Sequence, residues 1–158
     1  MTDSPDLWAS LVDRVRDRAA HSGAVALELT GDVSSAVAAV VACDALGPTN
    51  VTGLFLADAV IPEVRDLALH TGLDFRLEPV QPMLDAFLAN LTLGPAAATR
   101  LAARVRRVVL LALAEEEGRE VLDPIAEVPA SVLPELARWR NERALASGDP
   151  APIPVAAM

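Results

Sequence analysis

Short apolar runs separated by helical patterns organise the first third of the chain. Ala24–Leu29 and Val51–Leu56 are too short for helices and rich in Val and Leu, so they favour buried strands. Between them lies an apolar helical segment, which Ser34 or Ser35 could cap and which Gly47 would end. A strand, a helix and a second strand in this order predict a parallel pair joined by a right-handed crossover.

The same signals continue along the chain and predict further helices and two more short strands. Helices are expected over residues 4–20, 62–70, 82–91, 96–117 and 130–145, and strands over residues 74–78 and 120–122. This alternation predicts an α/β fold, a Rossmann-like three-layer sandwich with a mostly parallel sheet of about four or five strands and helices on both faces. Residues 1–146 are expected to form one domain, and the Pro- and Ala-rich residues 147–158 a C-terminal tail.

The composition limits which kinds of partner the protein is expected to bind and in which compartment it is expected. The formal net charge of −9 argues against a nucleic-acid surface and against attraction to an anionic membrane. No signal sequence or membrane span is recognised, so a cytoplasmic protein is expected, and the many Ala, Arg and Pro residues favour a GC-rich bacterial source.

The single cysteine, Cys43, lies in an apolar stretch and is expected to be a buried small side chain rather than a nucleophile. With two histidines and no Cys/His spacing, no metal site is expected.

The turn after the first strand, T-G-D-V-S-S, is the candidate ligand-binding loop. Ligands of open α/β sheets bind beyond the carboxyl ends of the strands, and a helix N-terminus attracts anions. Gly31 permits close approach, and the hydroxyls of Thr30, Ser34 and Ser35 could reach phosphate oxygens. The turn matches neither the G-x-x-x-x-G-K-[ST] nor the G-x-G-x-x-G pattern, and a capped helix without a ligand explains it equally well.

Several motifs in order give a resemblance to a known family. L-T-G-D-V-S-S-A with C-D-A-L-G resembles the S-G-G-[IV]-D-S-A and D-A-L-G of NAD synthetases, which belong to the N-type ATP pyrophosphatases and have an adenine nucleotide alpha hydrolase-like fold. P-V-Q-P-M-L-D-A-F-L and A-R-V-R are similar to further family motifs. E-V-P-A-S with L-A-R-W-R-N resembles the glutamine-dependent branch. The resemblance implies that Arg104 or Arg106 faces the nucleotide, and that the protein is a homodimer through helices of this region.

The departures from the family pattern affect the groups that hold phosphate. Asp32 replaces the second loop glycine, Ser34 replaces the loop aspartate, and Ala130 replaces the lysine of D-V-P-K-T. The family's T-G-N-K-S-E and G-Y-x-T-x-Y-G-D segments are missing, and the chain contains no lysine. A carboxylate at Asp32 would repel phosphate if it faced the nucleotide; alternatively, it points to solvent and caps the helix.

These departures lead to a main hypothesis and two alternatives. The main one is a degenerate NAD synthetase-like protein with no catalytic residues of its own, acting as a binding, regulatory or assembly partner in a homodimer or hetero-oligomer. The first alternative is an ATP-dependent adenylating amide ligase or NAD synthetase, ammonia- or glutamine-dependent, active alone or completed by another subunit. The second keeps only nucleotide binding, with ATP and magnesium as doubtful cofactors, at Thr30, Gly31, Ser34, Ser35, Arg104 and Arg106.

Overall fold

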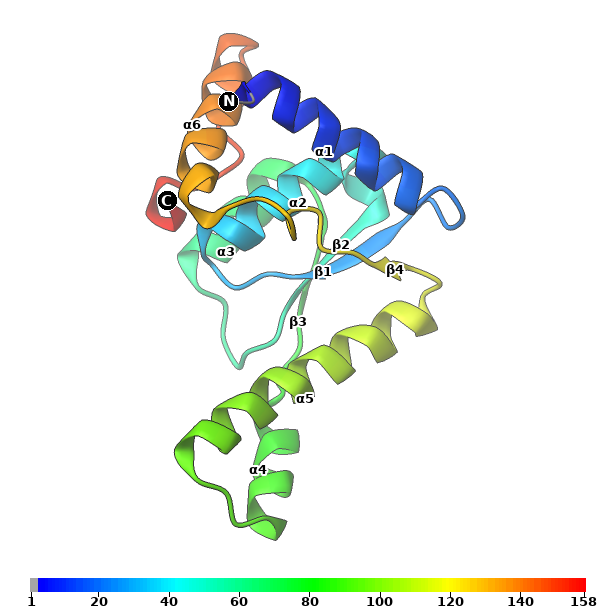
Figure 1. Ribbon diagram of the computed structural model, residues 1–158, viewed down its shortest axis with the longest axis vertical. Coiled ribbons are helices and arrows are strands. Elements are labelled where there is room, and N and C mark those ends of the chain that lie inside the picture. The colour runs from blue at the N-terminus through cyan, green and yellow to red at the C-terminus, as the bar shows by residue number, and fades with distance from the viewer. Residues whose placement is uncertain (1–2) are drawn as a thin grey trace.

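A parallel four-stranded sheet forms the centre of the computed structural model, which describes residues 3–158 (Figure 1). The strands are β1 (Val25–Glu28), β2 (Val51–Phe55), β3 (Asp74–Leu77) and β4 (Glu120–Val121), in the order β3-β2-β1-β4. All three pairings are parallel. The expected α/β architecture with a parallel sheet is therefore confirmed.

Helices cover both faces of the sheet and form two separate apolar cores. One core joins the sheet to α1 (Ser4–Arg18), α2 (Val33–Leu46), α3 (Pro62–Thr71) and α6 (Leu133–Ala146). The second joins the opposite face to α5 (Pro95–Glu116), through the buried Val105, Leu110 and Ala114. Helix α2 is apolar all round because it lies between the sheet and α1, so its side chains from Ser35 to Ala42 are buried.

The boundaries of the last helix differ from the sequence-based expectation. Residues 130–132 form a short 3₁₀ turn, and the α-helix begins at Leu133, which places Pro134 in the first turn. Proline is compatible with that position because its missing N–H would have no partner within the helix. Two further 3₁₀ turns cover Pro48–Asn50 and Val155–Ala157.

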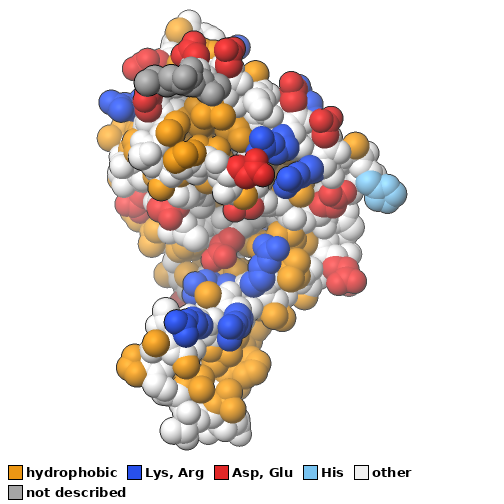
Figure 2. All heavy atoms as spheres, viewed as in Figure 1, with side chains coloured by type: hydrophobic (Ala, Val, Ile, Leu, Met, Phe, Trp, Pro, Cys, Tyr) orange, Lys and Arg blue, Asp and Glu red, His pale blue; other side chains and the backbone are white. Residues whose placement is uncertain are grey.

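Helix α4 (Gln81–Asn90) and the first half of α5 project from the sheet as an arm (Figure 1). No residue of α4 is buried, although its sequence predicts an apolar side. Phe87 is 48% exposed. The other large exposed apolar residues of the arm are Met83, Leu88, Leu91 and Leu93, the last two in the link between the helices. Val108, which is 64% exposed, and Leu111 lie beyond the arm, on the second half of α5. Figure 2 shows apolar side chains gathered over this projection, an apolar surface typical of a protein–protein contact.

The segment 147–158 packs back onto the domain. The side-chain amide of Asn141 donates to the carbonyl of Ile153 at 2.8 Å, and its oxygen accepts the Ile153 N–H at 3.0 Å. Ile153 is 1% exposed and belongs to the larger core. Within residues 3–158, no helix is both long and apolar enough to cross a bilayer.

Candidate functional site

The candidate loop joins the carboxyl end of β1 to the N-terminus of α2. Asp32, and not Ser34 or Ser35, is the N-cap of this helix: its carboxylate accepts the Ser35 N–H at 2.9 Å. The expected serine cap is therefore wrong: Asp32 caps the helix, and this exposed side chain also lines the cleft beside the loop. A carboxylate is favoured there because it satisfies a free N–H and meets the positive end of the helix dipole.

The hydroxyl of Ser35 is already used inside the loop. Ser35 Oγ accepts the Thr30 N–H at 3.0 Å and donates to the Asp32 carbonyl at 3.4 Å. Ser35 is buried, so these bonds hold the turn closed. Within the described residues, the backbone N–H groups of Val33 and Ser34 make no hydrogen bond, and Ser34 lines the adjacent cleft. The groups left for an anion are therefore fewer than the sequence suggests.

Gly31 is favoured mainly by the conformation of the loop and in smaller part by its packing. Its φ of 89° lies in the region that favours glycine. A Cβ at this position would lie 2.5 Å from Cδ1 of Ile61, which stands over the loop from the start of α3. The glycine therefore lets the segment before α3 approach the loop.

A cleft of about 320 Å³ opens beside the loop, between the carboxyl ends of β1 and β4. This is the point where the strand order reverses, because β2 and β4 lie on opposite sides of β1. Thr30 and Ser34 line one wall, Arg107 of α5 another, and Asp123 follows β4. The chain thus places polar groups from three elements around the cavity where ligands of this fold class bind.

The three arginines at the middle of α5 lie in different environments. Arg106 pairs with Glu28 of β1, with Nε 3.2 Å from Oε1. Arg107 lines the cleft beside the loop, whereas Arg104 is exposed and lines none of the described cavities. The structure therefore brings Thr30, Ser34 and Ser35 together with Arg107, a residue that the family motif does not single out.

Glu28 carries a perturbed carboxyl group at the floor of the cleft. Partial burial raises the pKa of Glu28 above its ordinary value of 4.5, and Asp32 adds to this rise. The guanidinium groups of Arg106 and Arg107 oppose it. The cleft is thus lined by three carboxylates, those of Glu28, Asp32 and Asp123, around one guanidinium, that of Arg107.

The carboxylates of the cleft do not converge on a common point. Among residues 3–158, no three or more His, Cys, Asp or Glu side chains are grouped as ligands of one metal ion. The side chains present do not fit a metal held by the protein alone, since a magnesium ion takes oxygen ligands in a near-octahedral arrangement.

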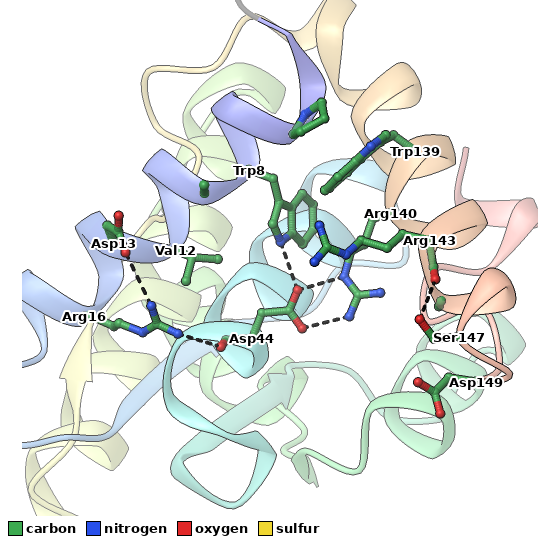
Figure 3. Close-up of a pocket in the computed structure, with 13 residues that line it drawn as sticks. Trp8, Val12, Asp13, Arg16, Asp44, Trp139, Arg140, Arg143, Ser147 and Asp149 are labelled. Carbon is green, nitrogen blue, oxygen red and sulfur yellow. Dashed lines mark hydrogen bonds and ion pairs between the residues drawn. The ribbon is translucent and has the colours of Figure 1, made fainter.

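Two family-like motifs far apart in sequence meet at the opposite end of α2 (Figure 3). Asp44, from C-D-A-L-G, accepts hydrogen bonds from Nε and Nη2 of Arg140, from L-A-R-W-R-N, at 2.7 and 2.8 Å. It also accepts the indole N–H of Trp8 at 2.9 Å. Trp139 packs against Trp8 with ring centroids 5.9 Å apart. These motifs therefore tie α1, α2 and α6 together.

Sequence reasoning did not anticipate this cluster. The available signal was the presence of a lone acidic residue near the end of an apolar helix and a basic residue beside a tryptophan. Nothing in the spacing of Asp44 and Arg140, which are 96 positions apart, indicates that they pair.

Comparison with known proteins gives a consistent family. A family model described as NAD synthase matches residues 6–127. The chain is 30% identical to the glutamine-dependent NAD(+) synthetase of Xylella fastidiosa, over 85% of this chain and 31% of the relative. It is 32% identical to the NH(3)-dependent NAD(+) synthetase of Methanoregula boonei, over 63% of this chain and 43% of that protein.

Solved structures show the same fold. The structure of glutamine-dependent NAD+ synthetase from Acinetobacter baumannii in complex with adenosine diphosphate has a TM-score of 0.85 at 22% identity. The match covers 98% of this chain and 35% of that chain. The NH3-dependent NAD synthetase from Campylobacter jejuni has a TM-score of 0.80 at 20% identity, over 89% of this chain and 75% of that one. The chain spans about a third of the length of the glutamine-dependent relatives.

Proposed function

The chain belongs to the NAD synthase family. Within this family, we propose that it acts as a binding, regulatory or assembly partner and has no NAD synthetase activity on its own. The observation that carries this proposal is the use of the loop by the protein itself. The carboxylate of Asp32 sits at the N-terminus of α2, where a phosphate would otherwise bind, and the Ser35 hydroxyl closes the turn.

The electrostatics of the cleft favour the same conclusion. Each pair of like charges about 4 Å apart costs about 1 kcal/mol in bulk water and about 4 kcal/mol at an effective dielectric of 20. Asp32 is exposed, so its repulsion lies towards the lower figure; Asp123 adds to it, whereas the charge of Glu28 is offset by its ion pair with Arg106. A triphosphate would therefore meet the carboxylates of Asp32 and Asp123 beside the guanidinium of Arg107. The missing lysines remove the usual means of balancing that charge.

Amide formation tests this proposal directly. The purified chain is incubated with ATP, magnesium, deamido-NAD and ammonia, and NAD is measured by a coupled dehydrogenase assay. We expect no NAD above the background of a reaction without protein. The matched control is an NH(3)-dependent NAD synthetase, such as the Methanoregula boonei relative, in the same buffer. Turnover by the chain alone would refute the proposal.

A second candidate function keeps the cleft as a working nucleotide site. The free N–H groups of Val33 and Ser34, with the Ser34 hydroxyl, favour it. The nucleotide would bind at Thr30, Gly31, Ser34 and Ser35, with Arg104 and Arg106 approaching from α5. The protein would then be an ATP-dependent amide ligase, active alone or completed by another subunit that supplies the missing segments.

Calorimetry and co-purification separate the two candidates. Heat of binding with ATP, AMP or NAD, together with a co-purifying subunit that restores amide formation, would support the second candidate. Binding without turnover under any combination would support nucleotide binding alone and would count against the repulsion argued for Asp32. No heat with any of the three nucleotides would exclude the second.

We also propose that two copies of the chain associate through the α4–α5 arm. Five large apolar side chains of this arm, Met83, Phe87, Leu88, Leu91 and Leu93, are exposed, which is costly for a projection surrounded by water. Light scattering after size-exclusion chromatography should give twice the monomer mass, and Phe87→Glu should give the monomer. As a matched control, Leu69→Glu replaces an exposed apolar residue on α3, outside the arm, and should leave the mass unchanged. A monomer in the unmodified protein would contradict this proposal.

A further inference from the structure

The largest described cavity lies away from the nucleotide cleft, between α1, α6 and the C-terminal end of α2 (Figure 3). Its volume is about 410 Å³, compared with about 320 Å³ for the cleft. Cavities that bind small molecules begin at about 300 Å³ and combine apolar walls with a few polar groups. The walls here include the rings of Trp8 and Trp139, with charged side chains between them.

Most charges around this cavity are neutralised within the protein. The Asp44 carboxylate receives three hydrogen bonds, two of them from Arg140. Arg16 pairs with Asp13 at 3.3 Å and also donates to two backbone carbonyls at the end of α2. These groups build the walls and have little capacity left for a ligand.

Among residues 3–158, two exposed charged side chains of opposite sign at this cavity make no ion pair. Arg143 lies over the ring of Trp139, 5.6 Å from its centroid, and makes no ion pair within the described part of the chain. Asp149 lines the same cavity and likewise makes no ion pair there. Its carboxylate is close enough to Arg140, one turn before Arg143 on α6, to contribute to the raised pKa of that guanidinium. Within the part of the chain that the structure describes, the cavity thus presents a cation and an anion that are not paired with each other or with another charge, beside two aromatic rings.

We propose that this cavity binds a free α-amino acid. The ligand's carboxylate would pair with the Arg143 guanidinium, which suits a planar two-oxygen partner. Its ammonium group would pair with Asp149, and its side chain would lie against the tryptophans. The three arginines and three aspartates of the lining sum to zero formal charge, which matches a zwitterion. A phosphorylated or acidic ligand would satisfy Arg143 but face Asp13 and Asp149. This inference does not depend on the function of the nucleotide cleft.

Thermal-shift measurements on the full chain test the proposal. Each of the common L-amino acids is added at about 10 mM, which is about tenfold above a millimolar Kd, and calorimetry then measures the Kd of any that raises the melting temperature. We expect at least one amino acid to bind. Its amide, which lacks the carboxylate, and its N-acetyl form, which lacks the ammonium group, should bind at least about tenfold more weakly, because each loses a charge-assisted contact.

Two substitutions test the residues. Arg143→Gln and Asp149→Asn should each weaken binding at least about tenfold, and neither side chain makes a hydrogen bond that the fold needs. Arg138→Gln changes an exposed arginine of the same helix outside the cavity and should leave the Kd unchanged. Circular dichroism establishes that all three variants fold. The proposal is overturned if no amino acid binds, if both cavity variants bind as tightly as the original chain, or if the amide and N-acetyl forms bind equally well.

Discussion

The contact between Asp44 and Arg140 gives the sharpest prediction about stability. Asp44→Asn keeps the size of the side chain but removes its charge, so Arg140 loses its carboxylate partner and an amide N–H₂ faces other donors. The two side chains are only 28% and 19% exposed. Removing one partner of a fully buried pair costs about 3–5 kcal/mol. Because this pair is partly exposed, we expect a loss of about 2–3 kcal/mol in the free energy of unfolding.

Urea unfolding followed by tryptophan fluorescence measures this loss, since Trp8 and Trp139 both lie at the contact. For a chain of this size, 2–3 kcal/mol corresponds to a fall of about 4–12 °C in Tm. A double-mutant cycle with Arg140→Met should show that the two losses are not additive, because the double variant leaves no uncompensated charge. Asp13→Asn breaks the exposed pair with Arg16 and should cost under about 1 kcal/mol. A loss below about 1 kcal/mol for Asp44→Asn would refute this reasoning.

Three further predictions concern groups at or near the loop and α2. Because burial raises the pKa of Glu28 above 4.5, the folded state binds more protons than the unfolded state. Stability is therefore lost as the pH rises from about 4.5 through the folded-state pKa, and Glu28→Gln should remove this loss. The same pH dependence of the free energy of unfolding in the original chain and in the variant, across that range, would contradict this prediction. Gly31→Ala should cost about 2 kcal/mol, mainly because its φ of 89° disfavours a Cβ and in smaller part because Cδ1 of the exposed Ile61 side chain must move. Gly148 has a similar φ of 84°, but a Cβ there would meet open space, so Gly148→Ala should cost less. Equal losses of stability in urea unfolding would mean that backbone strain alone sets the cost of both substitutions. Burial raises the pKa of the Cys43 thiol to about 12, so a disulfide reagent at neutral pH should modify it only after unfolding; rapid reaction of the folded chain would disprove this.

The loop shows why the fold was easier to predict than the candidate site. The apolar runs of β1 and β2 and the glycine after α2 fix the strand–helix–strand unit through local physics, and the structure agrees within one or two residues. The polar turn between them allowed several hydrogen-bond patterns of similar energy. Either serine or Asp32 could cap the helix, and the structure selects Asp32 because Ser35 is needed to hold the Thr30 N–H.

The arginines of α5 give a second example. Their order in the sequence places them on neighbouring faces of one helix, and the family motif directs attention to Arg104 and Arg106. Which of them faces the cleft depends on how the helix is rotated against the sheet. The buried Val105, Leu110 and Ala114 set that rotation, which points Arg106 to Glu28 and Arg107 to the cleft.

By itself, the sequence determined the succession of strands and helices, the parallel sheet, and the family resemblance, because periodicity and turn residues act over a few positions. Only the tertiary structure decided which charges meet. The pairing of Asp44 with Arg140 and the hydrogen bonds between Asn141 and Ile153 join residues whose separation in sequence carries no signal. Their partners are chosen by the packing of α1, α2 and α6, where the cost of burying an unmatched charge selects one arrangement.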